Sequence, residues 1–145
     1  MRFVVITHAE HTSKAGKLYS YGPYVREMNL WTKHVSTIEI VAPASQEKIN
    51  EIDIAYHKST EFTAIPNFNI TTVKNIFKAL FSIPTIMHVI YKAMKRADHI
   101  HLRCPGNVGL LGCVVQILFP NTPKTVKYAG NWDPKSKQPL SYKVQ

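Results

Sequence analysis

The stretch DHIHLRCPGNVGLLGCVVQILF, residues 98–119, decides the fold class of this chain. In it a short apolar strand runs through a proline–glycine turn directly into an apolar helix, as happens in parallel α/β sheets. We expect Cys104–Asn107 to form a type II turn, because proline fixes φ at the second position and glycine accepts the positive φ of the third. Asn107 would then cap the helix and leave the amides of residues 108–110 without helical partners, facing a crevice at the end of the strand. Such a helix start favours an anion, and open α/β sheets bind their ligands at this edge.

The same alternation of strand and helix recurs along the chain. Short apolar runs bounded by turn residues predict strands, and apolar positions that recur every three or four residues predict helices. The expected strands are 3–6, 37–42, 61–65, 98–103 and 125–129, and the expected helices are 22–35, 71–96 and 108–119. Strands that alternate with helices form a parallel sheet with right-handed crossovers. The sequence therefore predicts an α/β fold, a Rossmann-like parallel sheet of about five strands flanked by helices.

Two polar segments and one proline are less regular. Residues 7–21 are expected to form a loop, and residues 46–60 form either a loop or a short helix around 48–55. Pro84 lies inside the expected helix 71–96 and removes a backbone hydrogen bond there. That helix is therefore either kinked or split in two.

Composition limits the classes of protein and partner. The chain has 145 residues, of which 45% are hydrophobic, enough to bury the core of one domain. Lys and Arg outnumber Asp and Glu by 18 to 9, so the surface should attract phosphorylated sugars or nucleotides, acidic lipids or nucleic acid. No motif of an RNA-binding, zinc-finger or helix-turn-helix protein is present. We therefore do not expect nucleic acid as a partner.

Targeting signals and domain bounds are read from the apolar runs. The run at 3–6 is too short for the core of a signal peptide, and no run reaches the roughly 18–20 residues of a membrane-spanning helix. We expect a cytoplasmic protein, with a peripheral place on the inner membrane face as the second option.

Residues 1–133 are assigned to one Rossmann-like domain. Residues 134–145 begin an amphipathic segment and are interpreted as the start of a missing continuation.

Several well-known sites are excluded by their spacing. The residues after the first strand, Thr7–Glu10, are not the glycine-rich fingerprint of a dinucleotide site, and Gly16–Lys17 lacks the first glycine and the hydroxyl residue of a P-loop. We therefore predict no cofactor. Cys104 and Cys113 match no metal or redox spacing and are interpreted as reduced core thiols.

Histidines and one arginine are the candidate polar groups of the crevice. His99 and His101 share one face of a strand, but no carboxylate stands at ligand spacing, so hydrogen-bonded core histidines are favoured over a metal site. His8 and His101 lie near carboxyl ends of strands, where a ligand would bind. Arg103 ends its strand and either binds a phosphate or sugar carboxylate or covers the sheet edge and pairs with Glu10.

The helix 71–96 carries cations on its polar side. Lys74, Lys78, Lys92, Lys95 and Arg96 interrupt its apolar pattern. A basic amphipathic helix can lie on an anionic membrane, but a helix that covers a sheet also presents solvated lysines. Both interpretations remain open at this point.

Three segments together resemble a known family. The segments KLYSYGPYVREMNLW (17–31), HIHLRCPGNVGLLG (99–112) and KYAGNWDP (127–134), with the order of the elements, resemble the amino-terminal domain of GT-B glycosyltransferases. The likeness is closest to the retaining family-four type, the glycosyl transferases of group 1, and to bacterial enzymes that build cell-surface polysaccharides. It implies a transferase that moves a hexosyl group from a nucleotide-sugar donor to a glycan or lipid-linked acceptor without a metal.

The resemblance also implies roles for individual residues. In that family the amino-terminal domain mainly receives the acceptor, while a carboxyl-terminal domain, missing here, binds the donor. Gly16 matches the second glycine of the family's usual pair, with Ala15 in place of the first, and would bind the donor phosphate together with Lys17. Many relatives carry a histidine where Arg103 stands. The candidate cleft and acceptor residues are His8, His101, Arg103, Gly106, Asn107, Asn131, Trp132 and Asp133.

A second function class remains open beside this one. The chain could be a non-catalytic basic module that docks on anionic membrane through residues 71–96 or that binds a nucleotide. The stereochemical outcome of any transfer is implied only by the family and cannot be derived from these residues.

Overall fold

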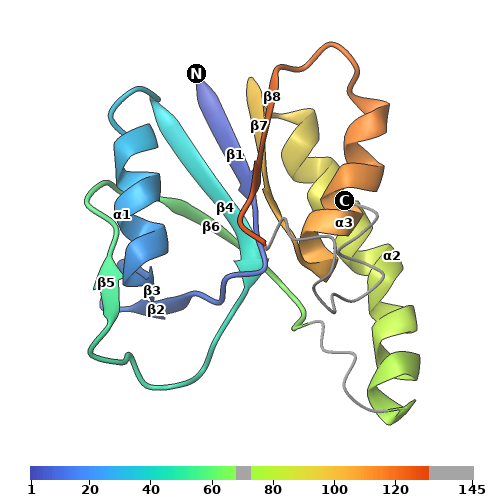
Figure 1. Cartoon of the computed structure of the whole chain (residues 1–145), viewed down its shortest axis with the longest axis horizontal. Helices are drawn as coiled ribbons and strands as arrows, with labels where there is room; N and C mark the ends of the chain where they lie inside the picture. Colours follow the sequence, from blue (N-terminus) through green and yellow to red (C-terminus); the bar gives the residue numbers. More distant parts are fainter. Residues whose placement is uncertain (68–72, 131–145) are drawn as a thin grey trace.

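The computed structural model describes residues 1–67 and 73–130, and a five-stranded parallel sheet forms its centre (Figure 1). The strands are β1 (Arg2–Ile6), β4 (Thr37–Pro43), β6 (Glu61–Ile65), β7 (His99–Cys104) and β8 (Lys124–Tyr128), in the order β6-β4-β1-β7-β8. Every neighbouring pair is parallel. The prediction of a Rossmann-like parallel sheet of about five strands flanked by helices is confirmed.

Helices cover both faces of this sheet (Figure 1). Helix α1 (Gly22–Trp31) covers one face, and α2 (Val73–Lys95) and α3 (Asn107–Val115) cover the other, with a short 3-10 helix, η1 (Gln116–Leu118), after α3. Side chains alternate along a strand, so Phe3 and Val5 of β1 join the core cluster under α1, while Val4 and Ile6 join the cluster under α2 and α3. None of the described helices is both long and apolar enough to span a bilayer.

Helix α2 runs as one element past its proline. Pro84 lies inside the helix and its side chain is exposed, whereas Ile86 and Ile90 are fully buried. The helix is therefore not split in two. Its exposed proline keeps the ring away from the packed face, where the apolar side chains stabilise the helix against the sheet.

A small second sheet replaces two segments that were expected to be irregular. Strands β2 (Thr12–Lys14) and β3 (Lys17–Tyr21) form an antiparallel hairpin, and β5 (Asp53–Ala55) pairs with β3. The prediction of a loop over 7–21 and of a short helix around 48–55 is wrong. At the hairpin tip Ala15 and Gly16 both have positive φ, 49° and 73°, as a two-residue type I′ turn requires.

The turn before α3 also differs from the prediction. The Cys104–Pro105 bond is cis, Gly106 has φ 156° and ψ 156°, and Gly106 rather than Asn107 is the N-cap of α3. The amide of Leu110 donates to the carbonyl of Gly106 at 2.9 Å, so it is already paired. The type II turn and the Asn107 cap are therefore wrong. Glycine is needed at position 106 because a Cβ there would lie 2.8 Å from Nδ1 of His8, a contact with a distant part of the chain.

One buried carboxylate joins the amino-terminal end of the sheet to the end of α2. The side chain of Glu39 is 1% exposed and accepts hydrogen bonds from Arg2 at 2.8 Å, Arg96 at 3.0 Å and Thr63 at 2.7 Å. Burial alone would raise the pKa of Glu39, but hydrogen bonds from Arg96 and Arg2 keep that pKa below its usual value. Arg2 also pairs with Glu61. The network therefore joins β1, β4, β6 and the residue that follows α2.

Replacing Glu39 by Ala should lower the free energy of unfolding by about 3 kcal/mol, because two guanidinium groups then lose a buried partner. The matched control is Glu61→Ala, since Glu61 also pairs with Arg2 but is 54% exposed. That change should cost less than about 1 kcal/mol. Urea unfolding of both variants measures the difference, and equal losses would contradict the assigned role of Glu39.

Candidate functional site

Two adjoining pockets open at the carboxyl edge of the parallel sheet, which points downward in Figure 1. The inner pocket, of about 340 Å³, is lined by Tyr24, Arg103, Cys104, Pro105, Ala129 and Gly130 together with the shared wall. The outer pocket, of about 380 Å³, lies beside the β2–β3 hairpin, and its polar lining includes Glu10, Tyr19, Ser45, Glu47, Lys48, Asn50 and Asp53. His8, Ala9 and Tyr21 line both pockets. The two pockets therefore adjoin each other along these residues and together form the candidate site.

His8 stands between the pockets because it follows the last buried residues of β1. Thr7 is still fully buried and its amide donates to the carbonyl of Val41 at 3.1 Å, whereas the side chain of His8 is exposed. Partial removal of water by the pocket walls, and then the charge of Arg103, lower the pKa of His8. The imidazole is therefore neutral at pH 7 and can accept a hydrogen bond from a ligand.

Arg103 lies in the inner pocket but is held by an acidic partner. Its Nη1 donates to Glu27 at 2.9 Å, and its guanidinium carbon lies 4.7 Å from the centre of the Tyr24 ring. Lys127 bonds the other oxygen of Glu27 at 2.8 Å. Burial would raise the pKa of Glu27, but Lys127 and Arg103 lower it, so the carboxylate is ionised. The alternative that Arg103 pairs with Glu10 is wrong. Arg103 does pair with a carboxylate, but it is that of Glu27 in α1 and not that of Glu10 in the first loop.

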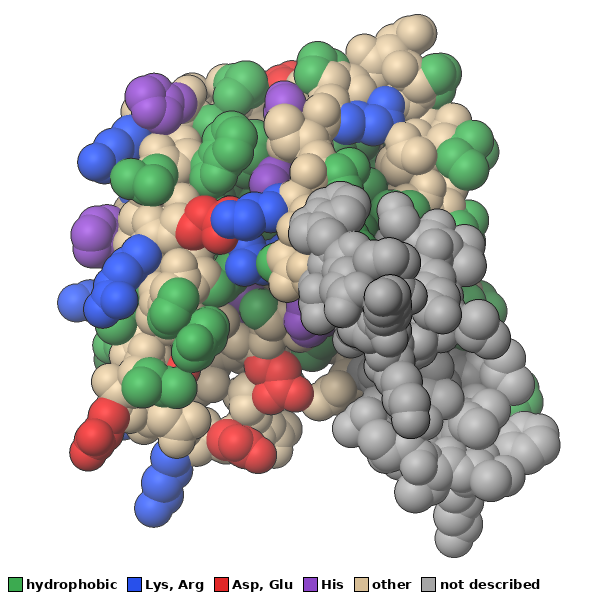
Figure 2. All heavy atoms as spheres, in the orientation of Figure 1, with side chains coloured by type: hydrophobic (Ala, Val, Ile, Leu, Met, Phe, Trp, Pro, Cys, Tyr) green, Lys and Arg blue, Asp and Glu red, His purple; other side chains and the backbone are tan. Residues whose placement is uncertain are grey.

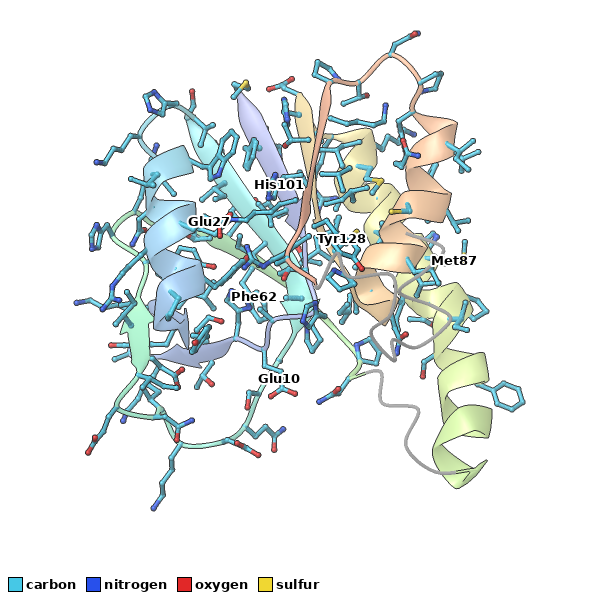
Figure 3. The ribbon with its side chains drawn as sticks, viewed as in Figure 1. Glu10, Glu27, Phe62, Met87, His101 and Tyr128 are labelled. Atoms are coloured by element: carbon cyan, nitrogen blue, oxygen red, sulfur yellow. The ribbon has the colours of Figure 1, made fainter. Side chains whose placement is uncertain are left out.

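His101 lies in the core on the α1 side of the sheet, the same side as Glu27 (Figure 3). Its Nδ1 is 2.8 Å from the hydroxyl of Thr125, and its ring packs against Phe3 and Trp31. Burial lowers the pKa of His101 to about 4. Its buried Nε2 has no hydrogen-bond partner among the described residues, and His101 is not part of either pocket wall.

The remaining predicted site residues lie in different places. Gly16 and Lys17 are exposed at the hairpin tip, outside both pocket walls. Gly106 lies directly against His8, and Asn107 begins α3 beside it. Asn131, Trp132 and Asp133, like the segment 134–145, lie outside the described residues.

A buried, hydrogen-bonded pair, His11 and Tyr56, lies next to the chain segment that lines the pockets. His11 is fully buried, with Nδ1 2.8 Å from the carbonyl of Ala9 and Nε2 2.8 Å from the hydroxyl of Tyr56. A carbonyl can only accept, so Nδ1 carries the proton and the hydroxyl of Tyr56 donates to Nε2. Burial lowers the pKa of His11 to about 4, which keeps the ring neutral. This pair fixes the chain that leads from His8 into the hairpin.

Sequence reasoning missed several of these groups. Tyr21 is 53% exposed and lines both pockets, and Glu27 fixes Arg103, yet neither was a candidate. The alternation in KLYSYGPY, with tyrosines at every second position, was the available signal for Tyr19 and Tyr21. No local signal joins Glu27 to Arg103, because 76 residues separate them.

Charge is divided unevenly over this part of the surface. In Figure 2 most of the histidine side chains lie over the middle and upper part of the visible face, whereas the lower edge carries several acidic side chains together with a cationic one. Glu10, Glu47 and Asp53 of the outer pocket come from that lower region, where the hairpin and the loop after β4 lie. Within the described part of the chain, no three His, Cys, Asp or Glu side chains stand close enough to hold a metal ion.

Comparison with protein-family models, with curated proteins and with solved structures found no match. The chemistry of the site therefore has to be derived from its own residues. It offers one guanidinium, one neutral imidazole, the exposed ring of Tyr21 and several carboxylates within two adjoining pockets. Such a set can bind a ligand that carries hydroxyl groups, apolar ring faces and a negative charge at one end.

The stability of the protein should fall as the pH drops from 6.5 toward 4. The pKa of both His11 and His101 is lowered to about 4 in the folded protein, so the unfolded chain binds more protons in this range. The contribution of each neutral histidine to the free energy of unfolding is fully present above the pKa that the histidine has in the unfolded chain. Acidification removes this contribution, on the order of 3 kcal/mol for each histidine near pH 4. Urea unfolding at pH 7 and pH 5 measures the slope. A His11→Gln variant should have a shallower slope, and an unchanged slope would contradict the assignment.

Proposed function

We propose that this chain is the acceptor-side half of a glycosyltransferase that moves a hexosyl group from a nucleotide-sugar donor to a glycan or lipid-linked acceptor. The observation that carries the proposal is the pair of pockets joined through His8 and Tyr21 at the carboxyl edge of the sheet. Parallel α/β sheets bind ligands at this edge. The three segments that resemble the family, 17–31, 99–112 and 127–134, all contribute residues to the pocket walls, which supports the resemblance.

The outer pocket suits the acceptor sugar. A sugar ring presents C–H groups on its faces and hydroxyl groups around its edge. The exposed ring of Tyr21 offers a flat apolar surface, and Glu10 and Asp53 accept hydrogen bonds from hydroxyl groups. A neutral sugar can satisfy these groups, whereas a phosphate would meet the carboxylates with unfavourable charge.

The inner pocket suits the reacting end of the substrates. One N–H of Arg103 is used by Glu27, and the fork of a guanidinium has further donors that can reach a ligand oxygen. His8 is neutral and lies on the shared wall, where it can accept a hydrogen bond from the acceptor hydroxyl that attacks. In the proposed function Arg103 therefore orients an anionic or polar group and His8 orients the nucleophile.

In this proposal the donor must also be bound by a second domain. Gly16 and Lys17 lie outside both pockets, so they would bind the donor phosphate only if a facing domain brings the donor to the hairpin tip. A carboxyl-terminal donor-binding domain of the kind found in the family would supply that face. Turnover is expected from the two halves together, without a metal ion.

The proposal is tested by NMR titration of the chain with hexoses and their glycosides, followed by turnover assays with a donor-binding domain joined to it. Amide shifts should centre on His8, Tyr21 and Arg103. Tyr21→Ala should weaken sugar binding about tenfold, or about 1.4 kcal/mol. The matched control is Tyr91→Ala, an exposed tyrosine of α2 that lines neither pocket and should not change affinity. Equal effects of both variants, or no donor turnover with UDP- and GDP-sugars and an acceptor, would reject the proposal.

A second candidate function rests on the outer surface of α2. Phe81, His88, Lys92 and Lys95 are exposed and recur at helical spacing along one stripe, with Phe81 84% exposed. An apolar group and two cations on one stripe can bind an anionic membrane. Arg96 is not available for this role, because its side chain pairs with buried Glu39.

Reversing the charge of Lys92 and Lys95 separates this candidate from the first. If α2 docks on membrane, Lys92→Glu with Lys95→Glu should abolish co-sedimentation with vesicles of acidic phospholipid. The control pair is Lys14→Glu with Lys33→Glu, which makes the same change of net charge at exposed positions off α2. Equal losses from both pairs would indicate non-specific attraction by net charge and would reject docking through α2.

A further inference from the structure

The two cysteines of the chain meet where β7 passes into α3. Cys104 ends β7 and is 1% exposed, Cys113 lies in α3 and is half-buried, and their Sγ atoms are 3.9 Å apart. Both thiols are free. Gly112 brings them together, because a Cβ at that position would lie 2.9 Å from Leu102 and 3.2 Å from Ile6. The glycine thus lets α3 pack close to the sheet and brings the neighbouring Cys113 against Cys104.

The contact makes the two thiols chemically unequal. The hydrogen bond from Cys104 lowers the pKa of Cys113 to about 7, while the same bond and burial raise the pKa of Cys104. Cys104 is therefore the thiol that keeps its proton, and Cys113 is the one that ionises first. A thiolate is the nucleophile in thiol–disulfide exchange, and Cys113 is the more accessible of the two.

We propose that Cys104 and Cys113 form a reversible thiol–disulfide pair that small disulfides such as oxidised glutathione convert to an intramolecular bond. In the first step the Cys113 thiolate attacks one sulfur of the small disulfide, forms a mixed disulfide and expels a thiolate. In the second step Cys104 loses its proton to the medium and attacks Sγ of Cys113, and the second small thiolate leaves. The protein loses two protons and two electrons, which together are two hydrogen atoms, and one molecule of small disulfide becomes two thiols.

The geometry favours a disulfide over other uses of the pair. The sulfurs must approach from 3.9 Å to about 2.05 Å, which the Cys113 side chain can cover with a small shift of α3. A metal ion would need more ligands, and among the described side chains no third His, Cys, Asp or Glu joins the pair. Cys104 also lines the inner pocket, so the bond would form in the pocket wall itself.

The test is equilibration of the folded chain in glutathione redox buffers, with acid quenching and intact mass measurement. The expected product lacks two hydrogen atoms and carries no glutathione. The fold holds the sulfurs in contact, so the equilibrium constant for closure should be at least tenfold larger in native buffer than in denaturant. Accumulation of a mixed disulfide that does not close, or equal constants in both solvents, would overturn the proposal.

Two single variants assign the order of attack. Cys104→Ser should trap glutathione on Cys113 as a stable mixed disulfide, because the second thiol is absent. Cys113→Ser should leave buried Cys104 almost unmodified while the chain stays folded, as checked by circular dichroism. Faster modification of Cys104 than of Cys113 would reverse the proposed mechanism. No sugar ligand enters these measurements, so their outcome is independent of the proposed function.

Discussion

The burial of β1 on both of its faces is the constraint on which the rest of the structure depends. Its four apolar residues, Phe3 to Ile6, are at most 1% exposed, and each side chain of this kind stabilises the fold by about 1.5–3 kcal/mol. A slip of one residue would exchange the two core faces, so the register with β4 and β7 is firmly set. The chain then has to leave the sheet at Thr7 and place His8 at the carboxyl edge. The position of the candidate site is therefore a consequence of the core.

Polar groups in the core are satisfied in different ways at its two ends. Near the amino ends of the strands, Glu39 stays charged because two guanidinium groups compensate its burial. His11, next to the pockets, and His101, within β7, instead stay neutral because burial lowers the pKa of each ring to about 4. A neutral ring needs no counter-charge, so these histidines support the pocket region without adding charge to it. The charges that a ligand would meet therefore come from Arg103 and the surface carboxylates.

The sequence predicts this fold well where the signal is local. The apolar run of β1, the short strand-like segments bounded by turn residues and the helical spacing in α2 need no distant partner to be recognised. The hairpin was missed because Ser20 takes a buried position in β3 and bonds the carbonyl of Glu10 at 2.7 Å, which breaks the apolar alternation. The prediction of the turn at Gly106 was wrong, and the local sequence also carries no sign that Gly106 lies against His8, almost a hundred residues earlier in the chain. The same limit applies to the site: strand ends predict that His8 and Arg103 stand at the carboxyl edge, but not that α1 covers His101 and supplies Glu27.

The distribution of charge around the pockets constrains how substrates can lie there. The chain as a whole carries a formal charge of +9, yet the outer pocket has three carboxylates, Glu10, Glu47 and Asp53, against Lys48. In the inner pocket, Arg103 is the charged side chain among the described lining residues, and Glu27, which pairs with it, is not part of the wall. A substrate pair with one neutral and one anionic member is therefore oriented before any specific contact forms, because its phosphate is repelled by the outer pocket and attracted to the inner one. Under the proposed function, this asymmetry places the acceptor sugar beside Tyr21 and an anionic or polar group of the substrates on the side of Arg103, with His8 between them.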